Sequence, residues 1–333
     1  MRNATEGVRY GNLARKCRVE IVAAVAVWGL LGFPAPSPAA DRFAPQSFAY
    51  VLQADKLAKT KAAAVTRLAR CDRDLIVLDC AYTAGQGGAW GAADLRQIRE
   101  AKPGRKVVAY LSIGEAENYR PYWQKPWTDA RGHPTSRAPK FLGPVNPDWP
   151  GNYRVKYWDS RWQAIIGESV DAVVRQGFDG LYMDIVDGFE FWEFDPARHD
   201  YIDNRKNPET GNTYRQDMVR WVRAIAARAR AKAGGKFLVI PQNASQLLAD
   251  PQYLKTIDAI GIEDLFTNGN KKQPAKAVAE RLEDLQAAKR AGKPLLLIEY
   301  GTQAAARAAA QQGARRHGMV LLLTDRQLTG RDL

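Results

Sequence analysis

Two carboxylates stand at the ends of short apolar segments, where acid–base chemistry would be placed. Asp184 lies near the end of GLYMDIV and Glu263 near the end of AIGIED. Glycoside hydrolysis requires one carboxylate that acts as nucleophile or base and a second that donates a proton. We predict Asp184 as the nucleophile and Glu263 as the proton donor, whose pKa desolvation in an apolar strand would raise. Nearby donors, among them Tyr82, Tyr110 and Asn243, would keep the nucleophile ionised.

Further polar side chains end or follow segments of the same kind. They are the candidate substrate-binding residues Asp79, Tyr82, Tyr110, Glu115, Asp187, Gln242, Asn243, Glu299, Tyr300 and Asp325. The amides of Gln242 and Asn243 suit hydrogen bonds to sugar hydroxyls. Glu299 is a rival proton donor, because it also ends an apolar run. So many carboxylates at segment ends favour a site that handles polar or cationic groups.

Metal-dependent chemistry is a weaker interpretation of the same residues. All histidines fall in loops or before a strand: His133, His199 and His317. Catalytic zinc and metal-dependent phosphodiesterases require histidine at strand ends, so both are disfavoured. A magnesium or calcium site of oxygen ligands from Asp184, Asp187 and Glu190 stays open as an alternative. We expect no metal and no cofactor.

Eight short apolar segments recur along the chain, as buried parallel strands do. They are residues 48–53, 75–80, 107–113, 180–186, 237–242, 259–264, 294–300 and 319–325. Helical patterns lie between most of them, at residues 56–70, 92–101, 161–176, 214–232, 275–290 and 304–315. This alternation predicts a single-domain α/β fold, a closed (β/α)8 TIM barrel. An open doubly wound sheet is the alternative, but the first strand lacks the glycine-rich turn that follows it there.

The connection after the third strand is unusually long and rich in aromatic residues. It runs from Gly114 to Asp179, and only its end has a helical pattern. Its many Trp and Tyr residues argue against disorder, and a long loop in a compact domain is usually functional. We expect it to form one wall of a cleft over the barrel mouth. One or two of its neighbouring tryptophans would contact sugar, from the set Trp123, Trp149, Trp158 and Trp192.

The first 40 residues have the pattern of an export signal. Basic residues precede an apolar run over residues 21–33, which the small-residue segment PAPSPAA follows. The pattern predicts cleavage near Ala39 or Ala40 and an exported mature domain, residues 41–333, in the periplasm or outside the cell. An uncleaved anchor is the alternative, although the run is shorter than the roughly 20 residues that span a bilayer. We expect no stable membrane insertion once the signal is removed.

Composition limits the partners of the chain. The 333 residues carry a formal net charge of +13, and the basic residues lie mainly on predicted helices. No basic run is interleaved with aromatic residues, so we expect no nucleic-acid partner. Cys71 and Cys80 flank an extended segment too long for a disulfide to bridge, so we expect two free thiols. We expect a monomer whose partner is its polysaccharide substrate.

Six motifs between Ala49 and Asp325 carry a family resemblance. They are VVAYLSIGEAENYR, NPDWPGNYRVKYW, GFDGLYMDIVDGFEFW, IPQNASQLL, GIEDLF and IEYGT. In this order they resemble the endo-α-1,4-polygalactosaminidase family of glycoside hydrolases, whose members are also described as cysteinyl-tRNA-synthetase-like extracellular proteins. Nothing in the chain supports a synthetase, since it has no HIGH-like ATP-binding motif. Cys80 and Ala81, which follow Asp79, depart from the family pattern.

The resemblance implies a (β/α)8 barrel that hydrolyses α-linked galactosaminoglycans. The catalytic Asp and Glu of the family match Asp184 and Glu263, and the Glu of its GEAE segment matches Glu115. We therefore expect a secreted, endo-acting hydrolase of α-1,4-linked galactosaminoglycan-type polysaccharide, acting with retention. The two catalytic carboxyl groups should lie roughly 5–7 Å apart, on the most negative face of the molecule. A non-catalytic polysaccharide-binding barrel, or an accessory protein of exopolysaccharide export, is the alternative.

Overall fold

A computed structural model describes residues 43–85 and 87–333 of the chain. The predicted export signal, residues 1–40, lies outside the described residues. All that follows concerns the unit that begins at Phe43.

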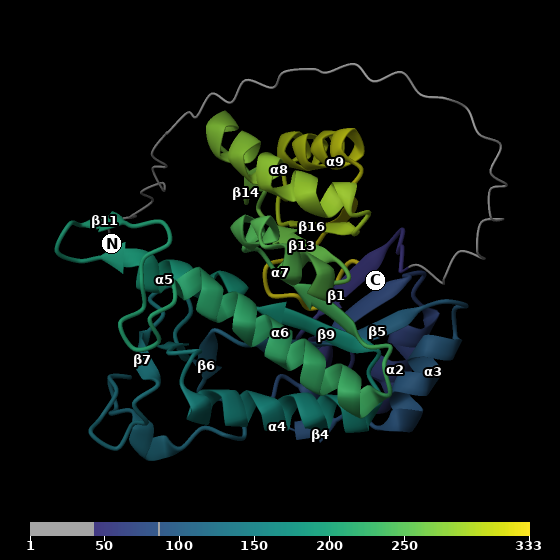
Figure 1. Ribbon diagram of the computed structural model, residues 1–333. Helices are drawn as coiled ribbons and strands as arrows, with labels where there is room; N and C mark the ends of the chain where they lie inside the picture. The colour runs from purple at the N-terminus through teal and green to yellow at the C-terminus, as the bar shows by residue number, and fades with distance from the viewer. Residues whose placement is uncertain (1–42, 86) are drawn as a thin grey trace, which may run out of the picture. The chain divides into compact units, whose positions relative to one another are not determined.

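Eight strands, one for each predicted segment, form the centre of this unit (Figure 1). They are β1 (Phe48–Val51), β2 (Leu75–Leu78), β5 (Lys106–Ser112), β9 (Gly180–Asp184), β12 (Leu238–Pro241), β13 (Ile260–Glu263), β16 (Leu295–Glu299) and β17 (Val320–Leu323). Five pair in the order β1-β2-β5-β9-β12 and three in the order β13-β16-β17. Each of these pairings is parallel.

Two seams join the two sets of strands. After β12, Gln242 forms a parallel bridge with Gly261 of β13, and the Asn243 N–H donates to the Gly261 carbonyl at 2.7 Å. On the other side β17 lies beside β1, and the Leu52 N–H donates to the carbonyl of Leu328 at 2.9 Å. The (β/α)8 barrel predicted from the alternating segments is confirmed.

Helices follow the strands on the outside of the barrel (Figure 1). The long ones are α2 (Lys61–Arg70), α3 (Ala92–Glu100), α4 (Ser160–Gln176), α6 (Tyr214–Ala233), α8 (Ala275–Arg290) and α9 (Ala304–His317). The helix predicted over residues 56–70 is two helices, because Thr60 caps α2 and separates it from α1 (Ala54–Leu57). Gly177 and Gly234 end α4 and α6 in the left-handed conformation, where a side chain would be strained.

The apolar residues form two layers. One layer packs the outer faces of the strands against the helices, with Ile76, Leu181 and Val222 among its members. The other fills the barrel interior, where Tyr50 and Tyr182 are fully buried. Strand residues alternate between these layers because successive side chains point to opposite faces. The interior layer therefore lies directly beneath any site at the strand ends.

The connection after β5 contains more regular structure than its sequence predicts. It holds β6 (Glu115–Glu117), β7 (Leu142–Val145), β8 (Asn152–Val155) and the short 3-10 helix η1 (Lys125–Trp127). The strands form an antiparallel sheet in the order β6-β8-β7. The alternating apolar and polar residues of NYRV allow β8 to bury Tyr153 and Val155, while Asn152 and Arg154 on the other face are half-buried. The aromatic residues of this connection therefore have a small core of their own.

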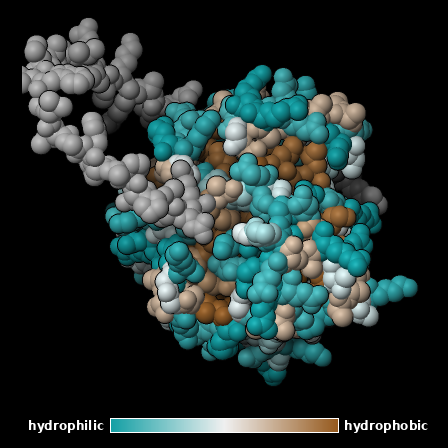
Figure 2. All heavy atoms as spheres, turned by 90° about the vertical axis from the view of Figure 1, so that its right-hand side faces the viewer, coloured by the Kyte–Doolittle hydropathy of each residue, from teal (hydrophilic) through white to brown (hydrophobic). Residues whose placement is uncertain are grey.

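Shorter helices and strands complete the unit. They are β3 (Ala81–Thr83), β4 (Gly87–Ala89), η2 (Val186–Gly188), α5 (Phe189–Glu193), β10 (Phe194–Asp195), β11 (Asp200–Tyr201), η3 (Ser245–Ala249), α7 (Pro251–Thr256), β14 (Thr267–Asn268) and β15 (Lys271–Lys272). Among the described residues, no helix combines the length and hydropathy needed to cross a bilayer. Figure 2 shows a mainly hydrophilic face with separate hydrophobic patches, as expected if most charges lie on solvated helix surfaces.

Cys71 and Cys80 are both free thiols, as predicted. Strand β2 runs between them and keeps them apart. Burial raises the pKa of the Cys80 thiol to about 12, and the neighbouring Asp79 carboxylate adds to that shift. Neither observation suggests a reactive thiolate, which needs a lowered pKa.

Candidate active site

Asp184 and Glu263 end two strands that flank β12. Gln242 follows β12, so its side chain stands between the two carboxylates. Its Nε2 donates to Asp184 Oδ1 at 3.1 Å and to Glu263 Oε2 at 2.7 Å. Because both oxygens contact one nitrogen, they lie at most about 6 Å apart, close to the roughly 5–5.5 Å of retaining glycosidases. The fold thus brings the two predicted catalytic carboxylates together.

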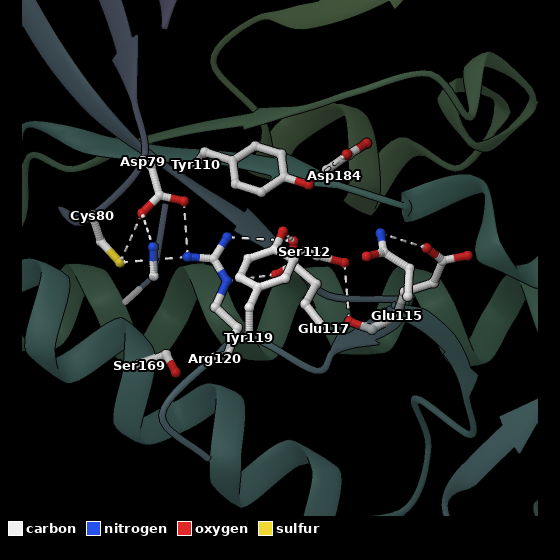
Figure 3. Close-up of polar contacts among 12 residues, drawn as sticks. Asp79, Cys80, Tyr110, Ser112, Glu115, Glu117, Tyr119, Arg120, Ser169 and Asp184 are labelled. Carbon is white, nitrogen blue, oxygen red and sulfur yellow. Dashed lines mark hydrogen bonds and ion pairs between the residues drawn. The ribbon is translucent and has the colours of Figure 1, made fainter. Parts of the chain in front are cut away.

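Tyrosines from the barrel interior surround these two carboxylates. The Tyr110 hydroxyl donates to Asp184 Oδ2 at 2.8 Å, as Figure 3 shows, and the Tyr300 hydroxyl donates to Glu263 Oε1. Below them, the rings of Tyr50 and Tyr182 pack with centroids 4.9 Å apart. We call Asp184 and Glu263, with these neutral donors, the tyrosine-lined pair.

Burial changes the proton affinity of both carboxylates. Desolvation, with the negative charge of Asp184, raises the pKa of Glu263 to about 8, in the direction that a proton donor requires. Desolvation, with the nearby Asp187, also raises the pKa of Asp184 to about 7, although the Tyr110 hydroxyl opposes the shift. The prediction that Asp184 stays readily ionised is therefore wrong. Tyr110 does donate to Asp184, but its hydrogen bond is weaker than the cost of burial.

The backbone turns sharply just after Asp184, Gln242 and Glu263. Ile185, Asn243 and Asp264 all have positive φ, at 54°, 56° and 47°. A β-branched residue such as Ile185 rarely adopts this conformation, and strain of this kind is concentrated at functional sites. Gly114 packs against this turn so closely that a Cβ would lie 2.1 Å from the Ile185 carbonyl oxygen. The Ile185 N–H then donates to Asp184 Oδ1 at 2.8 Å, which fixes the carboxylate.

A second set of polar side chains adjoins the tyrosine-lined pair. Asn243 Oδ1 accepts from the Glu263 backbone N–H at 3.1 Å, and its side chain also hydrogen-bonds Asp187. Burial, together with the charge of Glu190, raises the pKa of Asp187 to about 7. Gln246 donates to Glu190 at 2.7 Å. Within the described part of the chain, no group of three or more His, Cys, Asp or Glu is arranged to hold a metal ion.

Other carboxylates at the strand ends are neutralised by arginines. Arg120 pairs with Asp79 at 2.8 Å and with Glu117 at 2.7 Å, and Figure 3 shows its guanidinium between them. Arg154 pairs with Glu115 at 2.6 Å. We call these five residues the arginine-paired group. Burial raises the pKa of Asp79 and of Glu115, and the adjacent arginine opposes the shift in each case.

Several predicted substrate-binding residues are engaged within the chain instead. The Tyr82 hydroxyl donates to the Ala58 carbonyl at 2.5 Å, so it is not a donor to Asp184 as predicted. Glu299 is fully buried and accepts the N–H groups of Phe266 and Thr267 at 2.7 and 3.2 Å. Asp325 accepts the Thr329 hydroxyl at 2.8 Å. Within the structure Glu299 therefore serves as a hydrogen-bond acceptor for the segment after β13.

The tryptophans proposed to contact sugar lie in different environments. Trp123 packs edge-on against Trp127 and at a tilt against Tyr153 inside the connection after β5. Trp158 packs edge-on against Trp192, with ring centroids 5.0 Å apart. Trp149 is the exposed member, with 47% of its surface accessible. The contact with sugar stays a prediction, and Trp149 is the side chain with the free surface to make it.

The arginines are the residues that sequence reasoning missed. Arg120 and Arg154 lie within the aromatic-rich motifs, and neither stands out by pattern. Their signal is indirect: a fully buried carboxylate such as Glu115 requires a partner, and Arg154 faces it across the β6–β8 pair. Asn146 and Asn152 complete the set, donating to Glu115 at 2.9 and 3.3 Å.

Comparison with known proteins decides the family. The chain matches the model of glycoside-hydrolase family GH114 over residues 34–332. It belongs to this family. The glycoside hydrolase predicted from the motifs is thereby confirmed at the level of the family.

The relatives and solved structures agree with this result. An uncharacterized protein of Deinococcus radiodurans is 41% identical over 73% of this chain and 70% of its own length. The uncharacterized protein MJ1477 of Methanocaldococcus jannaschii is 32% identical over 71% of this chain, and the match spans 63% of its own length.

Two solved structures share the fold. Ega3 of Aspergillus fumigatus, solved with galactosamine, matches with a TM-score of 0.55 at 19% identity, over 78% of this chain and 87% of that one. The glycoside hydrolase domain of PelA from Pseudomonas aeruginosa matches with a TM-score of 0.58 at 18% identity, over 86% of this chain and 97% of that one.

Proposed function

We propose that this glycoside hydrolase cleaves internal bonds of an α-1,4-linked galactosaminoglycan with retention of the anomeric configuration. The observation that carries the proposal is the tyrosine-lined pair, two buried carboxylates bridged by one amide. Neutral donors hold both, so each carboxylate is free to gain or lose a proton without breaking an ion pair. Their spacing of at most about 6 Å leaves room for an anomeric carbon but not for an additional water molecule.

In the first step the ionised Asp184 attacks the anomeric carbon. A bond forms between its carboxylate oxygen and that carbon, while the bond to the glycosidic oxygen breaks. Glu263, whose higher pKa keeps it protonated when Asp184 is not, gives its proton to the departing oxygen. The products are a glycosyl ester of Asp184, a Glu263 carboxylate and a shortened chain with a free hydroxyl.

In the second step water cleaves the ester. Glu263, now a carboxylate, accepts a proton from the water as its oxygen attacks the anomeric carbon, and the bond to Asp184 breaks. Both residues return to their starting states. Two successive inversions at one carbon retain its configuration.

Two observations support an amino sugar as substrate: the acidic groups beside the tyrosine-lined pair, and the galactosamine bound to Ega3. Asp187 and Glu190 adjoin the tyrosine-lined pair and carry acidic groups that an amine would neutralise. The chain as a whole is basic, at +13. Charges beyond a Debye length of about 8 Å are screened, so a local acidic surface can still bind a cationic amino sugar. One of these carboxylates would bind the charged amine of the sugar.

We also propose that the protein is exported, as a monomer, to the periplasm or the exterior. The proposal rests on the pattern of residues 1–40 and on the polymeric nature of the substrate, which cannot enter a cell. N-terminal sequencing of secreted protein should begin near residue 40 or 41. Recovery of intact Met1 from a soluble cytosolic fraction would contradict export.

The test of the function uses α-1,4-linked galactosamine oligomers, fully and partly N-acetylated, with detection of new reducing ends. Cleavage to mixed oligomers shows endo action, and NMR of the first products shows whether the α-anomer is released. Glu263→Gln should lose activity on oligomers yet cleave glycosides with very good leaving groups, which need little protonation. Binding without cleavage by the wild-type chain would favour the non-catalytic binding barrel instead. A β-anomeric first product would refute retention.

A further inference from the structure

Gln242 donates both of its amide hydrogens to the two proposed catalytic carboxylates. One points to Asp184 Oδ1 and the other to Glu263 Oε2, at 3.1 and 2.7 Å. A primary amide has two N–H donors, so the nitrogen has none left for a sugar hydroxyl. Its two N–H groups are therefore not available for the hydrogen bonds to sugar hydroxyls that the sequence predicts.

The other end of the same amide is unsatisfied. Gln242 Oε1 is buried and has no hydrogen-bond partner among the described residues. An unpaired buried acceptor typically costs about 1–3 kcal/mol. Rotating the amide would place this oxygen against two carboxylates, and above about pH 7, where Asp184 is ionised, a negative charge would repel it. The side chain tolerates an unpaired oxygen to keep both N–H groups on the carboxylates.

A pair of carboxyl groups that holds one proton has a strong alternative arrangement. The protonated group can donate directly to the ionised one, in a charge-assisted O–H···O bond of about 2.5–2.7 Å. The carboxylate dyads that do this have their acids about 3 Å apart. No sugar ring fits between two carboxyl groups in such contact, so the arrangement would be inactive.

We propose that Gln242 is a positioning residue that keeps Asp184 and Glu263 from sharing a proton directly, and so preserves the gap that the anomeric carbon enters. The proposal rests on the proposed function for the roles of the two acids. The placement follows from topology, because β12 is the strand between β9 and β13, and Gln242 is tied to both neighbours. Its backbone N–H donates to Met183 of β9 at 2.8 Å, and it bridges to Gly261 of β13.

Other titratable groups face the pair, and the Gln242 variants leave these residues unchanged. Those around Asp184 and Glu263 are Tyr50, Tyr110, Tyr182, Tyr300, Glu117, Asp187, Asp264 and Arg326. Since they are common to wild type and variant, a change in proton sharing between the two acids reports on the amide itself.

The experiment measures the two acids without substrate. Carboxyl-¹³C-labelled Asp and Glu are titrated by NMR in the full chain, and spectra of Asp184→Asn and Glu263→Gln assign the signals. In Gln242→Ala the two apparent pKa values should move apart by about one unit or more, because a direct hydrogen bond stabilises the singly protonated pair. Gln242→Asn, which is too short to reach both acids, should give a smaller change in the same direction and serves if the alanine variant does not fold.

Gln176 offers a matched control. Its Nε2 also donates twice, to the carbonyls of Cys80 and Trp90 at 2.8 and 3.1 Å, and neither acceptor is a carboxylate. Gln176→Ala should leave both pKa values unchanged. If the two pKa values rise in parallel in the Gln242 variants, the amide acts only as a hydrogen-bond donor to each acid. If neither pKa moves, Gln242 has only a structural role. Either result would overturn the proposal that Gln242 keeps the two acids apart.

Kinetics separate this inference from the proposed function. On galactosamine oligomers, Gln242→Ala should lower kcat by about a hundredfold and leave KM within about twofold, since alignment of the reacting groups is lost while binding remains. If the wild-type chain cleaves no oligomer, the proposed function fails. The NMR titration would still show whether Gln242 holds the acids apart.

Discussion

The two groups of buried carboxylates at the strand ends differ in what balances their charge. In the arginine-paired group, Arg120 and Arg154 neutralise Asp79, Glu117 and Glu115 within 2.8 Å. In the tyrosine-lined pair, phenol hydroxyls and one amide donate to Asp184 and Glu263. Both groups are buried, so burial alone does not distinguish a reactive acid from a structural one.

The difference shows which kind of hydrogen-bond partner allows a buried carboxyl group to gain and lose a proton. An arginine keeps its charge at any physiological pH. It therefore opposes the rise in pKa that burial causes in the carboxylate beside it, and the ion pair holds that carboxylate in place. A neutral donor stabilises the ionised form only modestly, and desolvation can then bring the pKa near 7 or 8. The arginine-paired group joins the sheet of β6, β7 and β8 to the barrel, and the tyrosine-lined pair is the one that we propose performs the chemistry.

The largest expected effect is on kcat, and it should differ between a variant of Asp184 in the tyrosine-lined pair and a variant of Asp79 in the arginine-paired group. Asp184→Asn should lower kcat by at least about 10³-fold, because the variant has no nucleophile. Asp79→Asn should leave the kcat of folded enzyme within about tenfold, since its role is to hold Arg120 and the turn at Gly85. Reducing-end assays on galactosamine oligomers measure both. Similar losses of kcat in the two variants would show that an arginine-paired acid contributes to catalysis as much as Asp184 does.

Removal of an arginine tests the same contrast through stability. Arg120→Met leaves Asp79 and Glu117 buried without their cation and should destabilise the fold by about 3–5 kcal/mol. Tyr110→Phe removes one neutral hydrogen bond and should cost about 0.5–1.5 kcal/mol. Urea denaturation gives both values. The triple variant Asp79→Asn, Glu117→Gln, Arg120→Met should recover much of the loss, and failure to recover any would show that packing of Arg120 matters more than its charge.

The pH dependence of kcat/KM sharpens the account of the tyrosine-lined pair. Activity should fall below about pH 7, where Asp184 gains a proton, and above about pH 8, where Glu263 loses its proton. Tyr300→Phe removes a donor that lowers the pKa of Glu263, so the alkaline limb should move to higher pH. The acidic limb should shift less. An unchanged alkaline limb in this variant would mean that Glu263 does not set it.

The last expected effect is a gain in stability. The folded pKa of Glu263, about 8, lies above the ordinary value of 4.5. Such a group destabilises the fold progressively as the pH rises from the unfolded towards the folded pKa. Glu263→Gln should therefore raise the unfolding free energy by about 1–2 kcal/mol at pH 8 and by less at pH 5. Thermal melts at the two pH values measure it, and a gain that is larger at pH 5 would contradict the raised pKa.

The sequence by itself determined the barrel and the position of its two acids. Eight apolar segments such as LIVL and LLLIE, separated by helical periodicity, are sufficient because local propensity and burial agree in each. Parallel strands place their carboxyl ends at one face, so Asp184 and Glu263 had to share that face. Motif and topology therefore led to the same residues.

Only the tertiary structure decided how each polar side chain is used. Asp79, Glu299 and Gln242 have the same residue types and strand-end positions as a substrate-binding group would have, yet they bind an arginine, a loop and the two catalytic acids. The sequence also could not show that residues 142–155 pair into a sheet with β6, because those contacts join distant segments. Hydrogen bonds and desolvation depend on neighbours brought together by folding, and these neighbours set the pKa and the role of each group.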